Sequence, residues 1–300
     1  MPSLRARLVN RYVRGKLKYL PLPDIDSVKL RSMMEAGSIR LLPKSVARET
    51  ISAPVRGEWQ RPSNAAPGRT ILYLHGGGYV FGSPRLMAPI SCNLAAATRA
   101  PAFSLDYRLA PEHPCPAALD DALAAFDFLV SEGTPPHEIY VGGDSAGGGL
   151  ALAMMQALKE RGSDLPGGAF LLSPWTDLTA SGASIRENDE RDAMFTADSI
   201  TRGGVKYAGT LPLDDPRVSP LYGRFEGLPR LYVCVSDAEV LRDDSIRMVE
   251  KARKAGVSVE FQIENGLVHI WPLFAPFMPE SGRTIRKIAA FIRENQGAPL

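Results

Sequence analysis

Short apolar runs recur along the chain and alternate with longer segments that have helical spacing. The apolar runs lie at Ile71–Leu74, Ala102–Leu105, Ile139–Val141, Ala169–Leu172, Leu231–Val235 and Val259–Ile263. The helical segments lie at Arg85–Thr98, Pro116–Val130, Ala146–Arg161, Asp243–Ala255 and Arg283–Asn295. Continuously apolar strands that alternate with helices are typical of a parallel sheet covered on both faces. The pattern therefore predicts an α/β fold with a mostly parallel central sheet flanked by helices.

The first 20 residues predict an amphipathic helix with a basic character. Its apolar positions recur at helical spacing, and six basic residues precede the first acidic one, Asp24. Such a helix can touch a membrane surface, act as a transit peptide or pack on the protein body. We favour packing, because the polar face of any docked helix also needs charge. A second helix is predicted at Asp26–Ala36, and two alternating strands follow at Val46–Ser52 and Val55–Gln60.

One interval breaks the alternation of strands and helices. Almost sixty residues separate Leu172 from Leu231, and they include several acidic residues and a segment of mixed character at Phe195–Tyr207. A connection of this length is normally functional or carries helices of its own. We expect it to rise above the sheet and help to cover a pocket.

Composition narrows the class of protein. The 300 residues are 45% hydrophobic and 23% charged, which is typical of a globular protein. The formal net charge is only +2, so electrostatic attraction to nucleic acid is not expected. Three scattered cysteines, Cys92, Cys115 and Cys234, argue against a disulfide framework and a structural zinc site. No apolar run is long enough for a membrane helix, and the first residues lack the apolar core of a signal peptide. We expect a cytoplasmic protein without integral membrane association.

The segment around Ser145 carries the first chemical signal. Gly143–Gly147 reads GDSAG, which matches G-x-S-x-G, with a predicted strand before it and a predicted helix after it. Small neighbours allow a serine on such a tight turn to be exposed at the carboxyl end of the sheet. The alternative is a glycine-rich phosphate loop, but this would require Gly-Lys-Ser/Thr. Ser145 is therefore the predicted nucleophile.

A second glycine-rich segment follows the strand at Ile71–Leu74. Gly76, Gly78 and Gly82, with Asp106 further on, loosely imitate a dinucleotide-binding fingerprint, although residues 79–84 separate the glycines from the next helix. Backbone N–H groups that converge on one point would instead stabilise the anion of an ester carbonyl. We expect the N–H groups of Gly77, Gly78 and Ala146 to form this oxyanion hole. His75 then anchors the loop.

The histidines leave one candidate for the general base. On a fold of this kind the catalytic residues follow the order serine, acid, histidine, and His269 is the sole histidine after Ser145. His137 lies at the other end of the strand that leads to Ser145, and His113 belongs to a proline-rich loop. The acid is expected just past the strand at Leu231–Val235. The residues in that segment do not decide between Asp237 and Glu239 as the acid.

Several motifs together resemble the hormone-sensitive-lipase family of α/β-hydrolase esterases (bacterial family IV). They are HGGGY at His75–Tyr79, YRLAPEHP at Tyr107–Pro114, GDSAGG at Ser145, SPWTDL at Ser173–Leu178, DPRVSPLYG at Asp215–Gly223 and the late VHIWPLF. The resemblance covers nearly the whole chain from about residue 45. It implies Ser145 as nucleophile, His269 as base, and oxyanion donors at Gly77, Gly78 and Ala146.

The resemblance also bears on the acid and on the domains. The usual family stretch is Asp-Pro-Leu-x-Asp, and Glu239–Asp243 occupies it here, so Glu239 replaces the common aspartate. The resemblance further implies a helical cap made of residues 1–45 and 177–215. The catalytic domain then comprises residues 46–176 and 216–300, and we expect Tyr79 to contact the substrate in its pocket.

These observations predict a carboxylic-ester hydrolase for short- to medium-chain acyl esters that works through an acyl-enzyme. No cofactor and no metal are expected, and the partner is a small-molecule ester, not nucleic acid. An exposed edge strand near Val259–Ile263 suggests a homodimer. A related amidase or acyltransferase is the alternative, because the same residues serve both reactions. A non-catalytic small-molecule receptor of the same fold, like the gibberellin receptors, should lack part of the triad.

Overall fold

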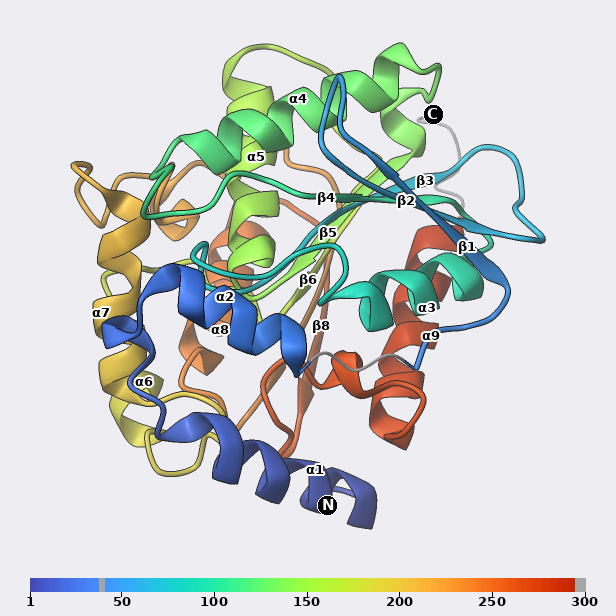
Figure 1. The fold of residues 1–300 in the computed structure, drawn as a ribbon. Helices are drawn as coiled ribbons and strands as arrows, with labels where there is room; N and C mark the ends of the chain where they lie inside the picture. The colour runs from blue at the N-terminus through green and yellow to red at the C-terminus, as the bar shows by residue number, and fades with distance from the viewer. Residues whose placement is uncertain (38–40, 295–300) are drawn as a thin grey trace.

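An eight-stranded sheet forms the centre of the computed structural model, which describes residues 1–37 and 41–294 (Figure 1). The strands are β1 Val46–Ile51, β2 Gly57–Pro62, β3 Thr70–Leu74, β4 Ala102–Leu105, β5 Ile139–Asp144, β6 Gly168–Leu172, β7 Leu231–Ser236 and β8 Val259–Glu264. Their order across the sheet is β1-β2-β4-β3-β5-β6-β7-β8. Only the pairs β1–β2 and β2–β4 are antiparallel among the described residues. The predicted α/β fold with a mostly parallel sheet is confirmed.

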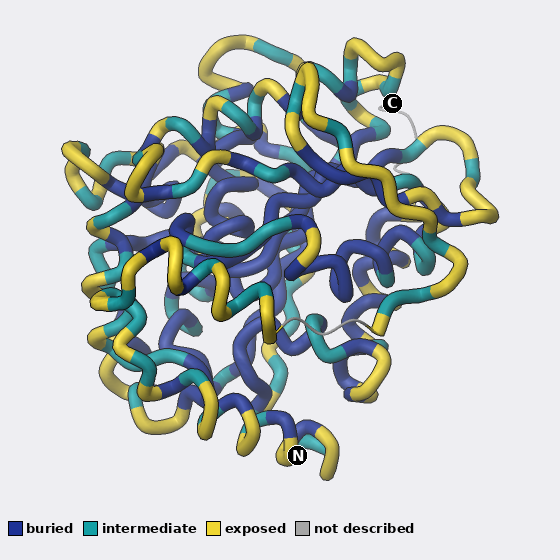
Figure 2. Tube along the Cα trace, viewed as in Figure 1, coloured by how far each residue is buried: buried dark blue, intermediate teal, exposed yellow. Residues whose placement is uncertain are grey.

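Helices cover the sheet on both faces. The main ones are α3 Ala88–Thr98, α4 Ala117–Ser131, α5 Ala146–Glu160, α8 Arg242–Lys254 and α9 Pro279–Arg293. One apolar core joins α4, α5 and α8 to alternate strand residues such as Leu72 and Val141. The second core joins α3 and α9 to the strand residues that point to the opposite face of the sheet, such as Tyr73 and Phe170. Both faces of the central strands are therefore buried, which explains their continuous apolar runs (Figure 2).

The start of one helix and the start of one strand differ from the sequence prediction. Helix α9 begins at Pro279, four residues before the predicted Arg283, because a proline is well tolerated in the first turn of a helix. Its predicted end, Asn295, lies outside the described residues. Strand β2 begins at Gly57 rather than Val55, after a turn through Pro54.

The N-terminal segment and much of the interval after β6 lie at the carboxyl edge of the parallel strands, beside Ser145. The N-terminal segment forms α1 Leu4–Val13, a π-helical turn at Arg14–Lys18, a short 3-10 turn at Leu22–Asp24 and α2 Ser27–Ala36. The long interval after β6 carries α6 Ser184–Glu187, α7 Ala197–Ala208 and a 3-10 turn at Pro220–Tyr222. In Figure 1, α1 and α2 lie beside α6 and α7 although about 150 residues separate them. Apart from the turn at Pro220–Tyr222, these elements fall in the segments 1–45 and 177–215, for which a cap is predicted.

Helix α1 packs on the protein body through Ala6, Val9 and Val13, as predicted. The three cysteines are buried and unpaired. None of the helices in the described part of the chain is both long and apolar enough to cross a membrane.

Candidate active site

Ser145 occupies the sharp turn between β5 and α5. Its backbone has φ 53° and ψ −120°, a conformation that is unfavourable for a residue with a side chain. The turn is held because the Ser145 N–H donates to Leu172 O at 2.8 Å, and Ser145 O accepts from Trp175 N at 2.9 Å. A Cβ atom at Gly147 would lie 2.0 Å from Leu74 O, so this position needs glycine. The G-x-S-x-G motif therefore places Ser145 above the end of β5.

The glycine loop after β3 lies against this turn. Gly77 and Gly78 have φ values of 120° and 60°, and a Cβ at Gly77 would lie 2.1 Å from Phe81 O. Both glycines line cavities together with Ser145. Ala146, the third predicted donor, is the first residue of α5 and is buried beside Ser145.

Asp144 joins the loop to the serine turn. Its Oδ1 accepts hydrogen bonds from Tyr73 Oη at 2.6 Å and from the Gly76 N–H at 3.0 Å. Burial raises the pKa of this carboxyl to about 6, although both hydrogen bonds favour its charged form. Sequence reasoning missed this contact, because Asp144 occupies the variable position of the motif.

His75 supports the loop from below. Its ring is fully buried, stacks on Tyr107 at 4.1 Å, and its Nδ1 lies 2.9 Å from Gly76 O. The Tyr107 hydroxyl donates to His75 O at 2.7 Å. Burial lowers the pKa of His75 to about 4. A neutral, packed ring of this kind fits the predicted anchoring role.

His269 follows β8 and meets Glu239, which follows β7. The His269 Nδ1 atom lies 2.5 Å from Glu239 Oε2, and both side chains are about 1% exposed. Burial by itself lowers the pKa of His269, but the charge and hydrogen bond of Glu239 outweigh it and raise the pKa above its ordinary value. Its Nε2 has no hydrogen-bond partner among the described residues and belongs to a side chain that lines the cavity at Ser145.

The rival acid, Asp237, has different partners. Its carboxylate accepts from the Gly266 N–H at 2.7 Å and forms an ion pair with Arg191 at 3.2 Å. These contacts fix the turn that precedes His269. The two acidic residues that the sequence leaves open thus differ in their contacts. Glu239 contacts the imidazole of His269, whereas Asp237 contacts the turn that precedes His269.

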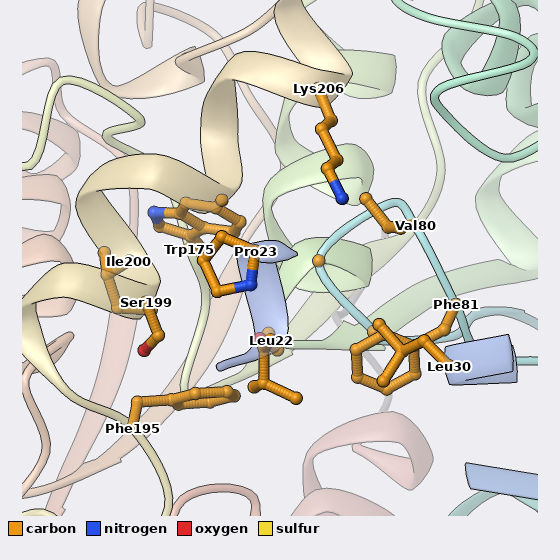
Figure 3. A pocket seen from close by; sticks show the side chains of 14 residues that line it. Leu22, Pro23, Leu30, Val80, Phe81, Trp175, Phe195, Ser199, Ile200 and Lys206 are labelled. Atoms are coloured by element: carbon orange, nitrogen blue, oxygen red, sulfur yellow. The ribbon is translucent and has the colours of Figure 1, made fainter. Parts of the chain in front are cut away.

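Two cavities meet at Ser145. The narrower one has about 550 Å³, open solvent included, and is walled mainly by apolar side chains (Figure 3). In that view Trp175, Phe195 and Ile200 surround it, and Lys206 extends from α7 toward Val80. The wider one has about 1320 Å³, open solvent included, and is lined by His269 together with residues of the N-terminal segment such as Tyr12 and Leu17.

Tyr79 has a different place from the one expected. It is buried, stacks on Tyr207 at a ring distance of 3.6 Å, and lines neither of these two cavities. Its neighbours Gly78 and Val80 line the narrower cavity instead. Tyr79 has a positive φ of 63°, and its ring contacts Tyr207 of α7 rather than either cavity.

Sequence reasoning also missed three groups around the imidazole. Phe195 packs edge-on against the His269 ring at 5.0 Å. Ser173 donates to Glu239 Oε1 at 2.8 Å, and Asp192 Oδ2 accepts from the Val240 N–H at 2.9 Å. Among the described residues no group of three or more His, Cys, Asp or Glu side chains is arranged to hold a metal ion.

Comparison with known proteins identifies the family. A family model described as alpha/beta hydrolase fold matches residues 71–273. An acetyl-hydrolase of Streptomyces hygroscopicus is 41% identical over 81% of either chain, and an esterase of Acinetobacter venetianus is 36% identical over 80% of this chain and 79% of its own. The crystal structure of an esterase from the bacterial hormone-sensitive lipase family matches with a TM-score of 0.93 at 35% identity, over 99% of this chain and 100% of that one. The chain therefore belongs to the hormone-sensitive-lipase family of α/β-hydrolase esterases.

Proposed function

We propose that the chain hydrolyses short- to medium-chain carboxylic esters through a Ser145–His269–Glu239 triad. The observation that supports the proposal best is the buried His269–Glu239 pair. The Nε2 atom of His269 has no hydrogen-bond partner among the described residues, and His269 lines the cavity that Ser145 also lines. A carboxylate at Nδ1 fixes the imidazole tautomer that can accept a proton at Nε2. His269 is thereby prepared to act as the base for Ser145.

The reaction proceeds in two halves. Ser145 Oγ attacks the ester carbonyl while His269 Nε2 takes its proton, and the N–H groups of Gly77, Gly78 and Ala146 stabilise the tetrahedral oxyanion. The imidazolium returns the proton to the alcohol oxygen, and the C–O bond breaks to leave an acyl-serine. Water then attacks the acyl carbonyl with His269 as base, which releases the acid and restores Ser145.

The two cavities receive the two parts of the ester. The leaving oxygen must take its proton from His269, and His269 lines the wider cavity but not the narrower one. The alcohol part therefore lies in the wider cavity, and the acyl chain points into the narrower one. Trp175, Phe195 and Ile200 limit the room for that chain, which supports a preference for short to medium acyl groups.

A serine substitution tests the proposal. Ser145→Ala should lower the hydrolysis of p-nitrophenyl acetate and butyrate to the uncatalysed level, while the circular dichroism spectrum stays that of the wild type. An activity within tenfold of the wild type would overturn the triad. A series of p-nitrophenyl esters from two to twelve carbons tests the chain-length preference, with kcat/KM expected to fall for the longest chains.

Matched ester and amide substrates separate this proposal from an amidase. We expect the ester to be cleaved and the amide of the same acyl group to be cleaved far more slowly. Faster cleavage of the amide would assign the same residues to amide hydrolysis.

A further inference from the structure

The outward surface of α1 carries an apolar row that the fold does not cover. Leu4, Leu8 and Tyr12 follow one another at intervals of four residues and are 65%, 54% and 65% exposed. The opposite side of the same helix is buried through Ala6, Val9 and Val13. This helix thus has two apolar sides, and packing on the protein body accounts for only one of them.

Cationic side chains lie beside this row. At 3.6 residues per turn, Arg7 and Arg11 fall next to Leu4 and Leu8 on the side away from the core, and Lys16 follows in the π-helical turn. All three are exposed, and no ion pair or hydrogen bond of their side chains is found among the described residues. No acidic residue precedes Asp24. We call Leu4, Arg7, Leu8, Arg11, Tyr12 and Lys16 the α1 face.

The helix that carries this face is firmly held. Ser3 donates to Glu280 through its N–H at 2.8 Å and its hydroxyl at 3.0 Å, and the Asn10 side chain donates to Gly266 O at 2.7 Å. The exposure of the apolar row is therefore a property of the docked helix. Figure 1 shows α1 at the edge of the molecule, with its outer side toward solvent.

The α1 face borders an apolar hollow, and this hollow shares lining residues with the wider cavity at Ser145. The hollow has about 730 Å³, open solvent included, and is lined by Leu8, Val9, Tyr12, Leu41, Phe274, Ala275 and Phe277. Tyr12 and Phe274 also line the wider cavity that contains Ser145 and His269. An amphiphile at the α1 face would thus lie next to the mouth of the wider cavity.

We infer that the α1 face docks on an anionic lipid surface. Exposed apolar side chains combined with cations are the pattern of helices that lie in a membrane interface. A second copy of this chain is a poorer occupant, because a two-fold interface would bring Arg7, Arg11 and Lys16 against the same cations of the partner. Docking would bring the wider cavity to the lipid surface, where a lipid ester could enter it. This consequence for substrate access rests on the proposed function, whereas the docking itself does not.

Vesicle binding tests the inference independently of catalysis. The full-length Ser145→Ala variant, which leaves lipid esters intact, is sedimented with vesicles of phosphatidylcholine that contain 30 mol% phosphatidylglycerol and with pure phosphatidylcholine vesicles. We expect binding to the anionic vesicles that falls as salt is raised, and much weaker binding to the neutral ones. Equal binding to both kinds of vesicle, or none to either, would overturn the inference.

Two pairs of substitutions locate the contact. Each cation near an anionic surface contributes about a five-fold gain in partitioning, so R7Q/R11Q should bind roughly 25-fold more weakly. L4S/L8S should lose about ten-fold or more, because the apolar row no longer inserts. R224Q/K254Q is the matched control, since it removes two exposed cations at the amino edge of the sheet, far from α1. It should bind like the parent.

The controls separate this inference from the esterase proposal. Made in the wild-type chain, R7Q/R11Q should hydrolyse dissolved p-nitrophenyl acetate at the wild-type rate. Unchanged vesicle binding by R7Q/R11Q would overturn the α1 face as a lipid contact. A dimer in sedimentation velocity that R7Q/R11Q or L4S/L8S converts to a monomer would overturn it too, because the face would then be covered by a second copy.

Discussion

Glu239 presents one carboxylate oxygen to His269 and uses the other to fix its own position. Oε2 lies 2.5 Å from His269 Nδ1, while Oε1 accepts from Ser173 Oγ at 2.8 Å and from the Ser236 N–H at 2.7 Å. The contacts from Ser173 and from the end of β7 therefore hold the Glu239 carboxylate in place beside His269.

Glu239→Gln should lower kcat by roughly 10⁴-fold, because an amide no longer stabilises the imidazolium or fixes its tautomer. Asp237→Asn is the matched control and should keep kcat within about tenfold of the wild type, since Asp237 contacts Arg191 and the Gly266 N–H. Steady-state kinetics on p-nitrophenyl butyrate measure both. A larger loss for Asp237→Asn than for Glu239→Gln would reverse the assignment of the acid.

The pH profile should reflect the Glu239–His269 pair. The base must be neutral to accept a proton, and the pKa of His269 is raised above 6.5 because Glu239 outweighs the effect of burial. The acidic limb of kcat/KM should therefore have its midpoint above pH 6.5. In Glu239→Gln the charge is gone and burial remains, so the residual activity should show its limb at lower pH. A limb that does not move would mean that another group controls it.

Replacing the strained serine by glycine should stabilise the fold. Ser145 has φ 53° and ψ −120°, a region that costs a residue with a Cβ about 1–3 kcal/mol. Both Ser145→Gly and Ser145→Ala remove the nucleophile, but the first also removes the strain. Ser145→Gly should unfold in denaturant with a free energy about 1–2 kcal/mol higher than that of Ser145→Ala. Equal stabilities would show that the turn carries no strain.

Asp144→Asn should change how stability depends on pH. Burial raises the pKa of Asp144 to about 6 in the folded state, so the wild type loses stability as the pH rises from about 4 to 6, where the folded state must release its proton. Asparagine can still accept from Tyr73 and Gly76 but carries no charge. The variant should gain up to about 3 kcal/mol relative to the wild type between pH 4 and pH 7. Denaturant unfolding at the two pH values measures this gain, and a constant difference would contradict it.

Lys18 should stabilise the packing of the N-terminal segment against the loop of residues 189–195. Lys18 is 2% exposed, and its ammonium group donates to the carbonyl oxygens of Asp189, Asp192 and Phe195, which belong to the loop beside His269. Lys18→Met leaves these carbonyls without a donor and should cost about 2–4 kcal/mol of stability. KM should rise as well, because Phe195 packs on the His269 ring. The exposed Lys29→Met serves as the control and should behave like the wild type in both measurements.

Most of the catalytic fold could be predicted from local patterns. Five of the six predicted runs match β3, β4, β6, β7 and β8 to within one residue at each end, and the run at Ile139–Val141 stops three residues before the end of β5. The central strands show such runs because a strand buried on both faces has no polar side to interrupt it. The glycine-flanked Ser145 was equally visible, because its turn and its steric limits are set by adjacent residues. His269 could be predicted as the base from chain order, because it is the sole histidine after Ser145.

The contacts that complete the site could not be predicted, because they join distant segments. Lys18 meets a loop more than 170 residues further along the chain, and Ser173 meets Glu239 across 66 residues. Nothing in the sequence around Lys18 distinguishes it from the exposed Lys16. Tyr79 illustrates the opposite error, because its motif suggested substrate contact and its backbone turns the ring toward Tyr207 instead.

The separation of the two cavities at Ser145 has a consequence for the fate of the acyl-enzyme. In the proposed mechanism the acyl group lies in the narrower cavity once the alcohol has left, and the next nucleophile approaches its carbonyl from the side of His269, which lines the wider cavity. Water and a second alcohol would thus compete for the wider cavity, whose lining includes Tyr12, Leu17 and Met34. In the proposed mechanism we therefore expect these N-terminal side chains to influence the partition between hydrolysis and acyl transfer, so that substitutions among them change the ratio of acid to new ester.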